Sequence, residues 1–367
     1  MARARRPRVH TADEEWARAR ALVLRLGWNA VSYQILNPGI AWWFDPAGDA
    51  VVGYATHART RVVAGAPVCA ESRLEAVVAA FAADARSRGE HVVYFGAGER
   101  LERRYRDDPR LALVPLGAQP WWDPAGWDAM VRAHRSLREQ RRRARAKGVR
   151  IEEWPATRAH RHPALQRVLA RWLATRGLPP LHFLVEPETL GHLVDRRVFV
   201  ARRGEDDDGI LAYLVATPIP GREAWLFEQW PRVPGAPNGT VDSLVDAAMR
   251  ALAADGARAV TMGLSPLSPH GPPLVMSPRW LGLVLRWVRA HGRRFYDFDG
   301  LDRFKSKFHP DSWEPIHAMD DGPRFTLRSL RAIAGAFSAG SPFVLVLRAI
   351  LMAAREETRR VRLRLRS

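Results

Sequence analysis

Cysteine is almost absent from this chain of 367 residues. Cys69 is the only one, so no intramolecular disulfide can form, and the composition fits a reducing compartment. It sits in the apolar run Ala66-Pro67-Val68-Cys69-Ala70, which favours a buried thiol over a reactive one. The first residues also lack the apolar stretch of a secretory signal, and we expect residues 1–10 to form a disordered basic arm.

Acidic residues are in deficit. The chain has 57 Lys+Arg against 39 Asp+Glu, a formal net charge of +18. A net positive charge of this size favours nucleic acid, an anionic membrane surface or a polyanionic substrate as partner. A genome that prefers arginine codons would also raise this number, and that alternative stays open.

Lysine is scarce, yet Lys305 and Lys307 flank one serine within the aromatic stretch of residues 295–315. On a strand the two lysines would share a face, whereas on a helix they would diverge by about 200°. We expect residues 294–298 to form a strand, which closes the sheet together with the loop that follows it. A compact ammonium suits a phosphate or a developing negative charge, and a solvated turn is the alternative.

Hydrophobic periodicity predicts two α/β units of similar order. For the first unit it predicts a helix from Thr11, a helix over 71–87, and extended segments over 40–44, 50–57, 61–63, 91–96, 111–117 and 120–122. For the second it predicts helices over 163–175, 241–255 and 279–291, and strands over 149–154, 198–202, 210–218, 224–230 and 259–264. Between the units, residues 128–147 are predicted to form one basic helix that ends at Gly148.

The tail after residue 322 changes character. Residues 332–354 are mainly apolar and small, but Arg348 and a glycine-proline break interrupt them. An arginine cluster follows, and apolar residues beside such a cluster suit a segment lying in the lipid headgroup region. Packing on the globular body and a true membrane span are the alternatives.

Four stretches, taken together and in order, resemble the cytosolic catalytic domain of bacterial phosphatidylglycerol lysyltransferases of the multiple peptide resistance factor type (DUF2156-like). These stretches are residues 136–149, 236–244, 262–268 and 296–310. The likeness spans roughly residues 28–319, and the first stretch is also similar to peptidoglycan aminoacyltransferases of the Fem type.

The resemblance implies an α/β fold of tandem GNAT-like domains, each a mixed central sheet flanked by helices, followed by an amphipathic, partly apolar helical tail. It divides the chain into the arm, an N-terminal domain, a basic connecting helix, a C-terminal catalytic domain and a membrane-interfacial tail. The expected boundaries are residues 1–10, 11–127, 128–148, 149–322 and 323–367.

The implied reaction moves an amino acid from an aminoacyl-tRNA to the hydroxyl of a membrane lipid, phosphatidylglycerol above all. Since the donor ester is already activated, the enzyme mainly supplies positioning and stabilisation of the tetrahedral oxyanion. No cofactor is expected, and no metal, because His160 and His162 read as solvent-facing residues. The implied location is the cytoplasmic face of the membrane, and the implied partners are aminoacyl-tRNA and phosphatidylglycerol. The family's multi-span flippase region does not occur in this sequence, and a separate membrane flippase as a further partner stays open.

The resemblance also suggests roles for individual residues. The catalytic candidates are Glu228, Arg232, Lys305 and Lys307. The candidates for substrate binding are Asn238, Asp242, Ser265, Asp299 and Arg303. The candidates for contact with the tRNA backbone are Arg138, Arg141, Arg142 and Arg145. We expect Glu228→Gln and Lys305→Ala to abolish transfer and to leave the fold intact. The bland alternatives are a surface pair of Glu228 with Arg232, a helix cap at Asp242 and a solvated basic face.

The chain departs from the family pattern at two places. Glu228 stands for an aspartate, and Pro231 takes the position of a motif arginine, with Arg232 one residue later. Gly65-Ala66-Pro67 lacks the acid of a glycine-aspartate-proline run.

Two other functions stay open. One is a GNAT-fold acyltransferase with an acyl-CoA or acyl-carrier donor, although the usual Arg/Gln-x-x-Gly-x-Gly/Ala loop is not evident. The other is a non-catalytic basic protein that binds nucleic acid or membrane.

Overall fold

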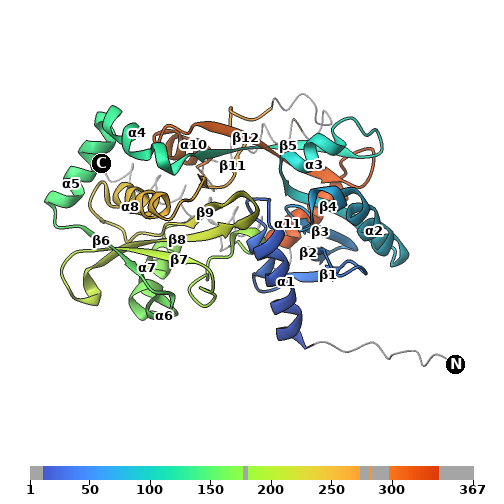
Figure 1. Cartoon of the computed structure of the whole chain (residues 1–367), viewed down its shortest axis with the longest axis horizontal. Coiled ribbons are helices and arrows are strands. Elements are labelled where there is room, and N and C mark those ends of the chain that lie inside the picture. Colours follow the sequence, from blue (N-terminus) through green and yellow to red (C-terminus); the bar gives the residue numbers. More distant parts are fainter. Residues whose placement is uncertain (1–10, 177–180, 273–281, 283–296, 339–367) are drawn as a thin grey trace, which may run out of the picture.

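A single twelve-stranded mixed sheet organises the chain in the computed structural model, which describes residues 11–176, 181–272, 282 and 297–338. The strand order is β1-β2-β3-β4-β12-β5-β10-β9-β8-β7-β6, with β11 beside β5. In Figure 1 the first half of the chain lies on the right and the second half on the left, with β5 and β12 running between them. The expected fold class, a mixed sheet flanked by helices, is confirmed.

The elements of the first half are α1 (Ala12–Leu26), η1 (Tyr33–Leu36), β1 (Ala41–Phe44), β2 (Val51–His57), β3 (Thr60–Ala64), η2 (Glu71–Arg73), α2 (Leu74–Ser87), β4 (His91–Ala97), α3 (Glu99–Tyr105) and β5 (Ala112–Trp122). The connection consists of η3 (Pro124–Gly126), α4 (Trp127–Ala133) and α5 (Arg135–Ala146).

The second half contains β6 (Arg150–Trp154), α6 (Ala156–Ala159), α7 (Pro163–Leu173), η4 (Phe183–Val185), β7 (Arg197–Arg202), η5 (Asp207–Gly209), β8 (Ile210–Ile219), η6 (Pro220–Arg222), β9 (Ala224–Gln229), α8 (Thr240–Ala254), β10 (Ala259–Thr261) and β11 (Ser265–Pro266). The last elements are α10 (Phe298–Ser306), β12 (Ser312–Asp320) and α11 (Leu327–Phe337).

Two predicted elements differ from the structure. The basic helix predicted over residues 128–147 is broken into α4 and α5 at His134, whose φ of −106° and ψ of 102° are extended. The ring of His134 stacks on that of His309, with 3.5 Å between centroids, so a tertiary contact accompanies the break. The predicted closing strand and loop is also wrong where it is described, because α10 begins at Phe298 and Asp297 caps it by accepting from the Gly300 N–H. The predicted helix over 279–291 lies outside the described residues, apart from residue 282.

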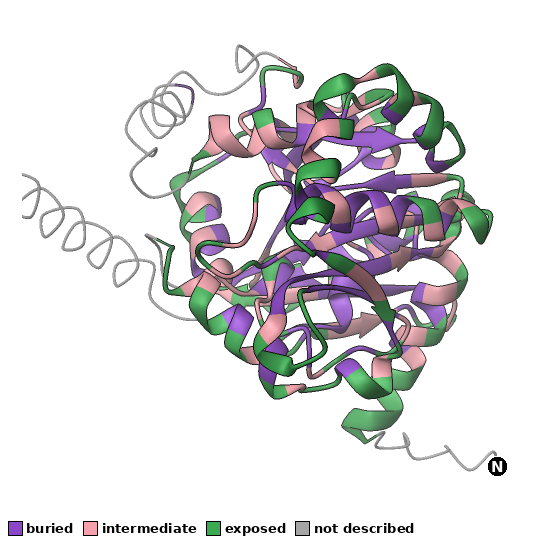
Figure 2. Cartoon of the chain, turned by 90° about the vertical axis from the view of Figure 1, so that its left-hand side faces the viewer, coloured by how far each residue is buried: buried purple, intermediate pink, exposed green. Residues whose placement is uncertain are grey.

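Both faces of the sheet are covered, and the core therefore has two sides. On one face of the first half, Phe81 and Val77 of α2 pack with Val63 and Val92 of the strands. α1 and α11 contribute to a separate apolar cluster that includes Val62 and Val93 on the neighbouring strand positions. Figure 2 shows the result: the strands are mostly buried, while the outer faces of the helices are exposed.

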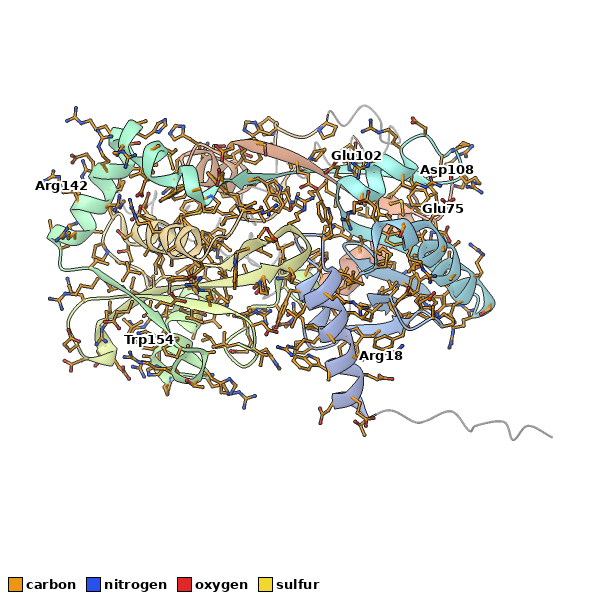
Figure 3. All side chains as sticks on the ribbon, viewed as in Figure 1. Arg18, Glu75, Glu102, Asp108, Arg142 and Trp154 are labelled. Atoms are coloured by element: carbon orange, nitrogen blue, oxygen red, sulfur yellow. The ribbon has the colours of Figure 1, made fainter. Side chains whose placement is uncertain are left out.

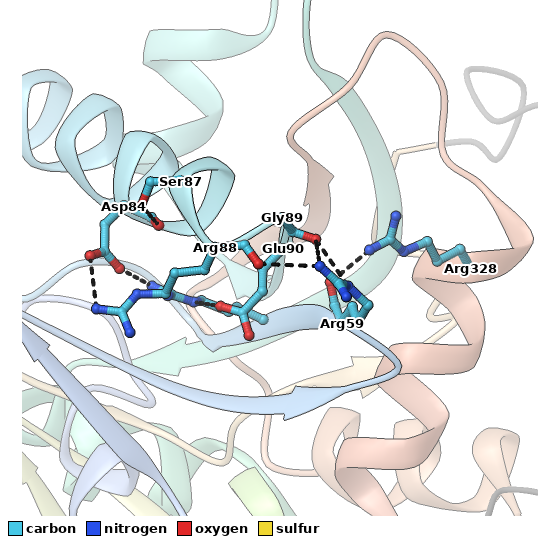
Figure 4. Close-up of polar contacts among 8 residues, drawn as sticks. Arg59, Asp84, Ser87, Arg88, Gly89, Glu90 and Arg328 are labelled. Atoms are coloured by element: carbon cyan, nitrogen blue, oxygen red, sulfur yellow. Dashed lines mark hydrogen bonds and ion pairs between the residues drawn. The ribbon is translucent and has the colours of Figure 1, made fainter.

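The end of the described chain returns to the first half. β12 pairs antiparallel with both β4 and β5, although the boundary expected at residue 322 assigns it to the second unit. α11 follows, and its Arg328 donates to the carbonyl of Arg59 at 2.6 Å (Figure 4). Arg328 also donates to Oγ1 of Thr60 at 3.0 Å. The Arg59 side chain in turn donates to the carbonyl of Gly89 at 3.3 Å, so α11 joins the contacts that link β3 with the start of β4.

The described part of the expected tail is therefore α11, which packs on β2 and β3. Within residues 11–176, 181–272, 282 and 297–338 no helix has the length and apolar character needed to cross a membrane. The rest of the expected tail, from residue 339 onward, lies outside the described part of the chain.

Because β12 lies between β4 and β5, we expect that the first half cannot fold by itself. A fragment of residues 11–148 would expose unpaired edges on β4 and β5 where β12 belongs, and it would lose the apolar cover of α11. We expect no cooperative thermal transition for this fragment by circular dichroism. As the control, co-expression with residues 149–367 should restore a folded complex. A cooperative transition of the isolated fragment would contradict the interlocked arrangement.

Candidate active site

α10 brings the two lysines to the ends of a parallel strand pair. β9 and β10 run parallel, and residues just beyond their carboxyl ends contact α10. Nζ of Lys305 donates to the carbonyls of Gly263 at 2.8 Å and Leu264 at 2.9 Å. The ring of Trp230 stacks on Phe304 with 5.7 Å between centroids. Ligands commonly bind beyond the carboxyl ends of strands in open α/β sheets, which makes this place a candidate site.

Lys305 is only 1% exposed. Burial lowers the pKa of its amine to about 7, and nearby Asp302 opposes this shift only in part. Two N–H groups of a neutral amine are enough to satisfy the two carbonyls that it binds. The amine is thus able to exchange a proton near neutral pH, which an ordinary surface lysine does not do.

Lys307 is more accessible, since its side chain is 37% exposed. Nζ lies 2.8 Å from Oδ1 of Asp242, in the first turn of α8, and also lies over the rings of Phe304 and Phe308 at 4.3 and 4.8 Å. Asp242 is therefore paired with a lysine and does not cap α8, whose N-cap is Gly239. Aromatic faces and a carboxylate hold the ammonium in place and leave part of it open to a ligand.

The side chain of Glu228 is buried, and it does not form the surface pair with Arg232 that was the alternative to a catalytic role. Its carboxylate is buried and accepts from Nε of Arg196 at 3.0 Å and from the Thr217 hydroxyl at 2.6 Å. It makes no pair with Arg232, which is exposed and follows β9. Because both charges are desolvated, removing only one of them leaves an uncompensated charge in the protein. We therefore revise one expectation: Glu228→Gln should weaken the fold as well as any activity.

The pair of Arg196 and Glu228 is part of a network that reaches the first half. Nη2 of Arg196 donates to Oδ1 of Asn37 at 3.2 Å, and its guanidinium lies 4.9 Å from the centroid of the Tyr33 ring. The preceding residue, Asp195, accepts from the Tyr33 hydroxyl at 2.9 Å and from Nε of Arg20 at 2.7 Å.

The other candidates for substrate binding are spread around the lysines. Asn238 is exposed in the turn before α8, and Gly239 beside it has a φ of +88°. A Cβ at Gly239 would collide with the carbonyl of Gln140, so this turn packs directly on α5. Ser265 is fully buried on β11, directly after the carbonyls that Lys305 binds. Asp299 is partly exposed and Arg303 exposed, and both lie on α10.

The expected tRNA-binding arginines fall into two groups. Arg141 pairs with the buried carboxylate of Asp246 on α8 at 2.8 Å, and Arg138 donates to the carbonyls of Val131 and Arg132. Arg142, which projects outward from α5 in Figure 3, is exposed and pairs with Glu139 on its own helix. Arg145 is exposed as well. The outer face of α5 therefore carries positive charge close to the turn that begins α8.

Sequence reasoning missed several residues of this region. Arg196 lies 32 positions before Glu228, and Thr217 lies 11 positions before it, so nothing in the local pattern linked them. Asp246 follows Asp242 at i+4 on the same helix, which was the one available signal for a second inward carboxylate. No group of three or more His, Cys, Asp or Glu residues that could hold a metal occurs among the described residues.

The buried amine makes stability depend on pH. The ordinary pKa of lysine is 10.5 and that of Lys305 is about 7, so between these values the unfolded chain binds more protons than the folded one. The contribution of Lys305 to the free energy of unfolding should thus rise with pH in this window, by up to roughly 1.4 kcal/mol per pH unit. Lys305→Met should flatten the profile, whereas Arg303→Met, an exposed change in α10, should not. Parallel urea-unfolding profiles for wild type and Lys305→Met from pH 7 to about pH 10 would contradict the buried, shifted amine.

Comparison with known proteins supports the fold and the family. The C-terminal domain (DUF2156) assigned as a lysylphosphatidylglycerol synthetase of Agrobacterium fabrum superposes with a TM-score of 0.75 at 22% identity, covering 90% of this chain and 99% of that one. L-PGS from Bacillus licheniformis gives a TM-score of 0.70 at 20% identity, covering 92% and 96%. No curated protein sequence matches the chain significantly. The family model described as "Phosphatidylglycerol lysyltransferase, C-terminal" matches residues 20–318, and the chain therefore belongs to this family and is a transferase of that class.

Proposed function

We propose that the chain transfers an amino acid from an aminoacyl-tRNA to a hydroxyl of phosphatidylglycerol. The observation that carries this proposal is the place of the lysine pair. Lys307 is partly exposed and forms an ion pair with Asp242, while Lys305 is buried and binds the backbone just after β10. Family membership supplies the class of reaction, and the accessible ammonium of Lys307 supplies the positive charge that such a reaction needs.

The chemistry is a transesterification. The acceptor oxygen attacks the ester carbonyl carbon and forms a tetrahedral oxyanion. The bond from that carbon to the ribose oxygen then breaks, and the proton of the acceptor hydroxyl ends on the ribose oxygen. Lys307 meets the oxyanion or the neighbouring phosphate as an ammonium, because its partial exposure allows contact. Lys305 fixes the Gly263–Leu264 turn and, with a pKa of about 7, is able to relay a proton.

Glu228 fits a positioning role in this scheme. Arg196 and Thr217 engage its carboxylate oxygens, and the side chain of Glu228 is only 5% exposed. It thereby fixes the end of β9, from which Trp230 reaches the α10 ring stack. The direct catalytic roles expected for Glu228 and Arg232 stay predictions.

The donor tRNA is proposed to lie along α5. That helix packs on α8 through the ion pair of Arg141 with Asp246, and it touches the turn at Gly239. Its exposed arginines would hold the phosphate backbone near the lysine pair without reading sequence. The acceptor lipid places the chain at the cytoplasmic face of the membrane as a peripheral protein, and a separate flippase would move its product.

A transfer assay tests the proposal against the two alternatives. Purified chain is incubated with phosphatidylglycerol liposomes and labelled lysyl-tRNA, alanyl-tRNA or acetyl-CoA, and the lipid is extracted. Label in the lipid from an aminoacyl-tRNA supports the proposal. Label from acetyl-CoA alone would favour an acyl-CoA transferase, and binding of tRNA and liposomes without transfer would favour a non-catalytic role.

Replacement of the two lysines should separate their roles. Lys307→Met removes the accessible charge, so we expect a higher KM for lipid or tRNA together with a lower kcat. Lys305→Met should lower kcat by at least about a hundredfold with little change in KM. Arg110→Met, which removes one charge from an exposed arginine of the first half, serves as the control. Wild-type kinetics in both lysine variants would refute this site.

Arginines of α5 should differ in their effect on tRNA binding. Arg142→Ala and Arg145→Ala should each weaken binding and reduce the slope of log K against log salt by about 1. Arg141→Ala should instead lower the melting temperature, because it leaves the buried Asp246 carboxylate with one partner fewer. Fluorescence anisotropy at several salt concentrations measures the first effect and a thermal melt the second. An unchanged slope in both Arg142→Ala and Arg145→Ala would place the tRNA elsewhere.

A further inference from the structure

A small pocket lies in the first half, away from the lysine pair. It opens at the carboxyl ends of β3 and β4, which are parallel like β9 and β10 of the lysine site. Each of these strand pairs has a long helix after its first strand, α2 in the first half and α8 in the second. The two halves thus present corresponding places in the fold.

Two guanidinium groups meet in this pocket beside one indole ring. The guanidinium of Arg100 lies 3.7 Å from the centroid of the Trp28 ring, and that of Arg222 lies 4.6 Å from it. Burial lowers the pKa of Arg100, and the like charge of Arg222 adds to the shift although Glu71 opposes it. An anion in the pocket would relieve this unfavourable placement of two positive charges.

Three N–H donors on lining residues lack an acceptor among the described residues. They are Nε1 of Trp28, Nε of Arg222 and Nε of Arg100. The last lies 3.2 Å from Oε2 of Glu71, an ion-pair distance, but without hydrogen-bond geometry. A buried donor without an acceptor costs free energy, and three in one pocket indicate a missing acceptor.

The carboxylates of the pocket are already engaged. Glu314 accepts from both terminal nitrogens of Arg222, at 2.8 and 3.2 Å, and from Nε1 of Trp121 at 2.8 Å. Glu71 and Glu99 both accept from Arg103, at 2.8 and 2.9 Å. No carboxylate of the pocket is therefore left over for Nε1 of Trp28 or Nε of Arg222, and Nε of Arg100 has only the carboxylate of Glu71 at an ion-pair distance.

We propose that this pocket binds the phosphate group of a small molecule. Phosphate offers several acceptor oxygens and a negative charge, which match the three donors and the two guanidinium groups. The site is distinct from the lysine pair and does not depend on the transfer reaction. The phosphate is either free in solution or part of a glycerophosphate headgroup, and these sources share the same chemistry.

Two variants remove donors in different ways. Trp28→Phe keeps an aromatic ring for the guanidinium groups to pack on, although a smaller one, and removes the N–H. Arg100→Gln removes the positive charge that has the weakest compensation. Arg110→Gln, an exposed arginine paired with Asp108 outside the pocket, is the control. Circular dichroism and melting temperature establish that each variant of the full chain is folded before binding is measured.

Isothermal titration calorimetry with inorganic phosphate and with glycerophosphoglycerol tests the proposal without tRNA or lipid bilayers. Both pocket variants should bind roughly tenfold more weakly than wild type, and Arg110→Gln should bind as wild type does. Equal affinity for the two probes indicates free phosphate as the ligand, and tighter binding of glycerophosphoglycerol indicates a headgroup. Absence of binding to wild type, or wild-type affinity in either folded pocket variant, would overturn the proposal. If the chain transfers amino acids but fails this test, only the proposal of phosphate binding is refuted. If it binds phosphate but transfers nothing, only the proposed transfer function is refuted.

Discussion

Arg196 and Glu228 form a buried ion pair where the two halves of the chain meet, and much of the structure depends on it. Arg196 also donates to Asn37 and lies against the Tyr33 ring, both in the first half. Breaking such a pair on one side strands a charge in a desolvated place, which is far more costly than the net value of the pair. Arg196 therefore fixes the position of the second half against the first, and it also binds Glu228 near the end of β9.

The sheet extends this constraint to both ends of the molecule. β12 pairs with β4 and β5, and β5 pairs with β10, so the strand ladder is continuous from one half to the other. The lysine site and the first-half pocket lie at corresponding parallel strand pairs of this one ladder. Glu314 of β12 binds Arg222 of the second half in the first-half pocket, so that pocket is not built from one half alone.

Local signals predicted much of the fold and less of the site. The helix predicted from Thr11 is α1, where Thr11 and Glu14 form a capping box, and the apolar periodicity of residues 71–87 predicted α2, because both features are encoded within a few residues. The pairing of β12 with β4 and β5 joins segments that are far apart in the sequence. The residues of β12 alone do not indicate which strands it pairs with. The scarcity of lysine and the family resemblance singled out Lys305 and Lys307, but whether a lysine is buried depends on what folds over it. The partner of Glu228 was missed for the same reason.

A double-mutant cycle on Arg196 and Glu228 tests the central claim most directly. The free energies of unfolding of Arg196→Met, Glu228→Met and the double variant are compared with that of the wild type. We predict that each single change costs about 3–5 kcal/mol and that the double variant is more stable than the sum of the two losses requires, by well over 1 kcal/mol. Losses that add to within about 0.5 kcal/mol would show that the two side chains are not coupled, and would contradict the account.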